Sequence, residues 1–168
     1  MKKILPALFG CFVLLLFATC KKDAKDLALG TIKTKINGDE KTFSIQAKAT
    51  RLNVTNGYGI QVQGYYRTGS TTNFTLTIAR PQAITTGTYT ENTASNPLVS
   101  MTHCVEVIVP CVFQTSSYGS TSNPASVTIT ELTNTYVRGT FKGDLKSSSS
   151  SGTSSIETFA NGAFYVSF

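Results

Sequence analysis

Hydrophobic and polar residues alternate with a period of two from about residue 29 to the end of the chain. This spacing places every second side chain on one face of a strand, whereas a helix needs a period near 3.6. Residues 31–36 form the first such segment. Asn37-Gly38 follows, and both residue types tolerate the positive φ angles of a tight hairpin turn. The pattern therefore predicts an all-β domain.

Turn residues separate the alternating segments along the whole chain. Further strands are expected at residues 41–49, 58–67, 74–80, 84–90, 104–110, 112–117, 126–132, 136–145 and 156–168, with a loop at 91–103. The Ser-rich stretch 146–155 is expected to form the tip of a hairpin. About nine short strands joined by sequential hairpins favour an antiparallel β-sandwich, with a small barrel as the alternative.

The last segment changes the parity of its apolar residues. Phe159 is at an odd position, whereas Phe164, Val166 and Phe168 are at even positions. A shift of one residue moves side chains to the other face of a sheet. The sequence therefore predicts a β-bulge at Asn161-Gly162 that restores the inward face.

The first residues follow a different pattern. Two lysines precede an apolar run from residue 4 to residue 17, which is shorter than the roughly 20 residues of a membrane-spanning helix. This order predicts a cleaved export signal at residues 1–19. Residues 16–20 (LFATC) resemble the lipobox of bacterial lipoproteins, in which Cys20 becomes the acylated mature N-terminus. A plain secretory signal followed by a chance cysteine is the alternative.

Removal of the signal leaves a predicted flexible tether at residues 20–28 and a single domain at residues 29–168. The net charge of +6 then falls to +4, because 13 basic residues face 9 acidic ones. The basic residues are scattered singly, and no basic run is interleaved with aromatic residues. The sequence therefore gives no support for nucleic-acid binding.

Only two cysteines remain in the predicted domain, Cys104 and Cys111. A pair of this kind in an oxidising compartment is expected to form a disulfide. Free thiols are one alternative. A metal site that adds His103 and Glu106 is another, but the spacing matches no zinc motif and a closed structural site needs four ligands. We expect no metal and no cofactor.

Two kinds of residue carry candidate chemistry. Tyr65, Tyr118 and Tyr165 face outward by parity and are candidate contacts for a glycan or a protein partner, with ordinary sheet surface as the alternative. The carboxylates Glu106, Glu131, Asp144 and Glu157 could divide acid and base roles in a glycan-active hydrolase. Glu131 is prominent because it shares parity with the apolar Val127 and Ile129. One histidine and no nucleophile motif argue for a non-enzymatic protein.

Several short motifs occur in a characteristic order. They are Ile36-Asn37-Gly38, Leu76-Thr77-Ile78, Gly87-Thr88-Tyr89, Val127-Thr128-Ile129-Thr130, Tyr136-Val137-Arg138-Gly139-Thr140-Phe141 and a final Gly-Ala-Phe strand. Together with the lipobox, they resemble an uncharacterised family of Bacteroidota lipoproteins with an all-β domain of unknown function. The resemblance implies a protein that is lipid-anchored in the bacterial outer membrane, at its periplasmic face or at the cell surface. It implies no catalytic residues, so a binding or accessory module is expected.

Overall fold

The computed structural model describes residues 26–55, 57–91, 98–105, 113–114, 123–147 and 155–168. Within them, eleven strands follow one another: β1 (Thr31–Ile36), β2 (Asp39–Phe43), β3 (Ile45–Val54), β4 (Gly57–Tyr65), β5 (Asn73–Arg80), β6 (Gly87–Thr90), β7 (Leu98–Cys104), β8 (Phe113–Gln114), β9 (Ser126–Leu132), β10 (Tyr136–Ser147) and β11 (Ile156–Ser167). In these residues we find no helix with the length and apolar character to cross a membrane.

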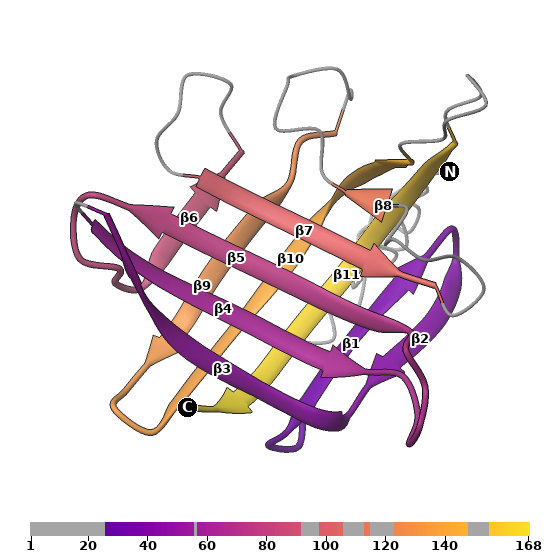
Figure 1. The fold of residues 1–168 in the computed structure, drawn as a ribbon, viewed down its shortest axis with the longest axis horizontal. Helices are drawn as coiled ribbons and strands as arrows, with labels where there is room; N and C mark the ends of the chain where they lie inside the picture. Colours follow the sequence, from indigo (N-terminus) through magenta and orange to yellow (C-terminus); the bar gives the residue numbers. More distant parts are fainter. Residues whose placement is uncertain (1–25, 56, 92–97, 106–112, 115–122, 148–154) are drawn as a thin grey trace, which may run out of the picture.

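The strands form two antiparallel layers that pack face to face (Figure 1). One layer has the order β2-β1-β11-β10-β9-β6, and the other has the order β7-β5-β4-β3. The short strand β8 pairs with both β10 and β7 and so links the layers along one edge. The strands of the two layers cross in Figure 1. The described strands do not close, so the predicted β-sandwich is confirmed and the small-barrel alternative is wrong.

The predicted loop at residues 91–103 is wrong in its second part, because Leu98–Cys104 form β7. Val99, Met101 and His103 alternate along this strand and are buried. Pairing with β5 stabilises the strand, although Met and His have little intrinsic β-propensity. The strand predicted at 104–110 continues into residues outside the described part of the chain.

The strand predicted at residues 41–49 is divided between the layers. β2 ends at Phe43 and pairs with β1, whereas β3 begins at Ile45 and pairs with β4. Gln46 has a φ of 51°, and the β3–β4 register shifts between Ile45 and Lys48. This irregularity lets the chain pass from one layer to the other while Phe43 stays fully buried.

Aromatic rings from both layers fill the core. Phe74 of β5 stacks on Phe141 of β10 and on Phe159 of β11, with centroid distances of 4.8 and 5.5 Å. A Cβ on Gly139 would lie 2.6 Å from Cζ of Phe164. The absent side chain therefore leaves room for the Phe164 ring, and the core packs around glycine as well as phenylalanine.

The bulge predicted in the last strand is confirmed. Gly162 pairs with Phe141 but Phe159 pairs with Gly143, so β11 has one more residue than β10 between these pairs. Asn161 has a φ of 52° in this segment. Phe159 and Phe164 are consequently both buried, on either side of the bulge. The predicted Asn37-Gly38 turn is confirmed as well, with φ angles of 51° and 93°.

Candidate functional site

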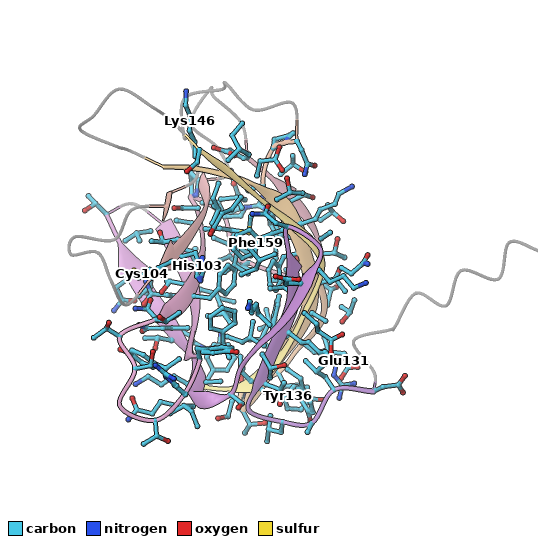
Figure 2. All side chains as sticks on the ribbon, turned by 90° about the vertical axis from the view of Figure 1, so that its right-hand side faces the viewer. His103, Cys104, Glu131, Tyr136, Lys146 and Phe159 are labelled. Atoms are coloured by element: carbon cyan, nitrogen blue, oxygen red, sulfur yellow. The ribbon has the colours of Figure 1, made fainter. Side chains whose placement is uncertain are left out.

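A hydrogen-bonded pair joins the two layers in the interior. Nδ1 of His103, on β7, lies 2.7 Å from Oε2 of Glu157, on β11. The two side chains are only 9% and 14% exposed. Figure 2 shows His103 between the layers, with Phe159 on the facing layer. The pair therefore crosses the sandwich rather than lying on its surface.

Aromatic rings surround the imidazole of this pair. Phe43 and Phe159 meet the ring of His103 edge-on, with centroid distances of 5.8 and 5.7 Å. A polar pair in such apolar surroundings must satisfy its own hydrogen bonds. The arrangement is that of a structural contact between the layers, and it adds no nucleophile to the candidate chemistry.

Several predicted site residues lie outside the described part of the chain: Cys20, Glu106, Cys111 and Tyr118. The disulfide between Cys104 and Cys111 therefore stays a prediction, as does the lipid on Cys20. Among the described residues, no group of three or more His, Cys, Asp or Glu side chains is placed to hold a metal ion.

Tyr65 and Tyr165 lie on opposite sides of the sandwich. On β4, Val62 and Gly64 are buried, and Tyr65 has the opposite parity. On β11, Phe164 and Val166 are buried, and Tyr165 has the opposite parity. Each tyrosine therefore points away from the core, but from a different layer. The two predicted ligand contacts cannot belong to one site.

Tyr165 belongs to a compact group that we call the outer aromatic cluster, formed by Glu131, Tyr136, Arg138 and Tyr165. The guanidinium of Arg138 lies 3.9 Å from the centroid of the Tyr165 ring. The ring of Tyr136 meets that of Tyr165 edge-on at 5.2 Å. Register explains the group, because Arg138 on β10 pairs with Tyr165 on β11 and with Glu131 on β9.

Glu131 holds the polar end of the outer aromatic cluster together. Arg138 Nη1 donates to Glu131 Oε1 at 2.9 Å, and the Tyr136 hydroxyl donates to Glu131 Oε2 at 3.1 Å. This hydrogen bond to the carboxylate raises the pKa of Tyr136, with smaller contributions from desolvation and from nearby charge. The cluster is a preorganised combination of two phenol rings and one ion pair.

The parity argument for Glu131 is wrong. Gly139 pairs with Ile129 but Arg138 pairs with Glu131, so Thr130 is an extra residue in β9. This bulge turns Glu131 to the outer surface while Leu132 packs against the core. Glu131 is therefore an ion-pair partner of Arg138 and not an inward-facing carboxylate.

Asp144 and Glu157, the other described candidate carboxylates, do not lie in one site. Asp144 accepts a hydrogen bond from Asn123 Nδ2 at 3.1 Å. Glu157 pairs with Leu145 in the β10–β11 register, so Glu157 and Asp144 belong to opposite faces of the sheet. Within the described residues, the two-carboxylate arrangement of a hydrolase finds no support.

The outer face of the second layer has a different character. Its outward positions on neighbouring strands pair as Gln63–Thr75–Thr102 and Gln61–Thr77–Ser100, with Tyr65 beside Asn73 at the end. Gln61 Nε2 donates to Thr77 Oγ1 at 3.4 Å. The described outward positions of β4, β5 and β7 contain no charged residue, and Lys48 of β3 lies beside Gln63 at the border of this surface. We call this surface the amide–hydroxyl face.

Sequence reasoning identified Tyr165 as outward-facing but missed its neighbours Tyr136 and Arg138. Both share outward parity on β10, which was visible in the alternation. Their contact with Tyr165 depends on the β10–β11 register, which no local pattern reveals.

Comparison of the chain with protein-family models, curated proteins and solved structures found no match.

Proposed function

We propose that this protein is a lipid-anchored binding module of the bacterial outer membrane, at its periplasmic face or at the cell surface. Residues 1–19 would be the export signal, Cys20 the acylated residue and residues 20–28 the tether. The lipobox and the order of the strand motifs support membership of the uncharacterised Bacteroidota lipoprotein family. Several acyl chains on one residue hold a soluble domain firmly to a bilayer, because each buried methylene contributes about 0.8 kcal/mol.

The ligand that we propose is a neutral polysaccharide, bound at the amide–hydroxyl face. The observation that carries this proposal is the contiguous row of Gln and Thr side chains beside Tyr65, without a charged residue at the described outward positions of β4, β5 and β7. Amides and hydroxyls both donate and accept hydrogen bonds, so they complement sugar hydroxyls. The ring of Tyr65 adds an apolar surface with a polar end.

A polysaccharide-binding measurement tests the ligand. The mature protein is expected to be retained in gels or arrays that contain some neutral polysaccharides, and Tyr65→Ala should lose that retention. Tyr165→Ala is the matched control, because it removes the same side chain from the opposite face and should keep binding. Equal loss in both variants, or no retention on any polysaccharide, would refute the proposed ligand.

The anchor is tested separately by mass spectrometry of the mature protein. The N-terminal peptide should begin at Cys20 and carry fatty acyl chains. A peptide that begins elsewhere, or a bare thiol at residue 20, would refute the anchor without any consequence for the polysaccharide test.

The glycan-active hydrolase remains the alternative function, and no described arrangement favours it. Its two carboxylates would need to flank one bond at a separation of about 5–10 Å. Arg138 lies opposite Glu131, and six residues of strand, or about 20 Å, separate it from Asp144. Release of reducing ends from a bound polysaccharide would contradict the proposed binding role.

A further inference from the structure

The predicted tether joins the domain beside the outer aromatic cluster. The Gly30 backbone N–H donates to the Tyr165 carbonyl at 2.8 Å, and Thr31 is the register partner of Tyr165. Only about ten residues separate Cys20 from Gly30, and they span at most roughly 35 Å when fully extended. The opposite end of β11, nine residues from Tyr165, is about 30 Å away and lies within that reach. A lipid on Cys20 would therefore bring the attachment point beside Tyr165 close to the bilayer, and side chains near that point would have to set the orientation.

The chemistry at this point suits the boundary between lipid and water. Tyr136 and Tyr165 each combine an apolar ring with a hydroxyl, a combination that is enriched at membrane interfaces. Leu29, directly before the entry point, is 55% exposed. Lys35 and Lys142, exposed at outward positions of the same layer, supply ammonium groups for lipid phosphates.

The two outer faces differ in their number of cations. The outward positions of the first layer include Lys33, Lys35 and Lys142 as well as Arg138. The exposed acids at its described outward positions, Glu40 and Glu131, are each paired with one of these cations. The described outward positions of β3, β4, β5 and β7 include one cation, Lys48, the register partner of Gln63. An anionic lipid surface therefore complements the first layer better than the second.

We propose that the outer aromatic cluster rests in the headgroup layer of the membrane that holds the Cys20 lipid. This inference depends on the proposed anchor. It deepens the proposed function, because a domain seated on its first layer presents the amide–hydroxyl face, with Tyr65, away from the bilayer. The lipid would then hold the protein, and the cluster would set its orientation.

A single tryptophan tests this orientation, because the chain contains no tryptophan. Tyr136→Trp places the reporter in the cluster, and Tyr65→Trp places the same reporter on the opposite face. Each acylated variant is reconstituted into vesicles of phosphatidylethanolamine and phosphatidylglycerol, with and without brominated acyl chains. Tyr136→Trp should show a blue-shifted emission and lose intensity with brominated lipid, while Tyr65→Trp should show neither change.

A second pair of variants guards against a folding defect in the first. Thr140→Trp and Thr75→Trp again place one reporter on each outer face, at half-buried outward positions of β10 and β5. Similar quenching on both faces, or none on either in protein that floats with the vesicles, would overturn the orientation. Absence of flotation together with an unmodified Cys20 would instead refute the anchor. The two failures are therefore distinguishable.

Discussion

The interior pair of His103 and Glu157 allows a quantitative test of how the layers are joined. Three variants form a double-mutant cycle: His103→Leu, Glu157→Leu and the combination of both. Each replacement is apolar and similar in volume to the side chain that it removes. The cycle therefore removes the 2.7 Å contact in three ways without opening a large cavity.

The expected magnitudes follow from burial. His103→Leu removes the hydrogen-bond partner of a carboxyl group that is only 14% exposed, and a buried polar group left without its partner costs about 1–3 kcal/mol, or more when it is charged. Glu157→Leu leaves the imidazole of His103 without this hydrogen bond and should also cost about 1–3 kcal/mol. The double variant leaves neither polar group in the apolar site and should be more stable than His103→Leu by about 2 kcal/mol.

Urea unfolding followed by circular dichroism measures all three differences. The midpoints should shift while the slope m stays constant, because the surface exposed on unfolding hardly changes. Simple addition of the two single effects, with a coupling below about 0.5 kcal/mol, would refute the reasoning. That result would mean that the pair contributes nothing specific to the contact between the layers.

Three further changes have defined outcomes. Burial raises the pKa of the Glu91 carboxyl group above its usual 4.5, and its Oε1 has no hydrogen-bond partner among the described residues. The folded protein therefore binds this proton more tightly than the unfolded chain does. Its free energy of unfolding should fall as the pH rises from 4.5 through the folded-state pKa. Glu91→Gln should be the more stable protein at neutral pH, and unfolding across this pH range checks it. Asn161→Val should cost about 1–2 kcal/mol at a φ of 52°, while Asn161→Gly should stay near wild type in urea melts. Gly139→Ala would place a Cβ 2.3 Å from the Thr128 carbonyl oxygen, so a loss of about 1–3 kcal/mol or more is expected in the same assay.

Local signals predicted the parts of the fold that depend on neighbouring residues. Alternation gave the bounds of β1, and the Asn37-Gly38 dipeptide gave its hairpin turn. The change of parity between Phe159 and Phe164 located the β11 bulge. Each of these features is decided within a few residues of chain, because side-chain direction and turn conformation are local properties.

Features that depend on distant partners were not predictable in this way. β7 is a strand because β5 pairs with it, and Met101 and His103 carry no strong signal of their own. The passage between layers after Phe43 depends on which strands β2 and β3 find as partners. The contacts of Tyr165 likewise require the register of β10, so parity alone gave its direction but not its neighbours.

The two bulges of the first layer build the outer aromatic cluster together. A regular β9 would place Glu131 opposite the buried Val137, and an unpaired carboxylate there would cost several kcal/mol. A regular β11 would give Tyr165 the inward parity of Phe159 and turn Phe164 outward. The extra residue Thr130 turns Glu131 outward, and the extra residue Asn161 does the same for Tyr165. The two bulges that keep Glu131 and Tyr165 out of the core therefore also bring them into the outer aromatic cluster. Loss of either bulge should disrupt this cluster.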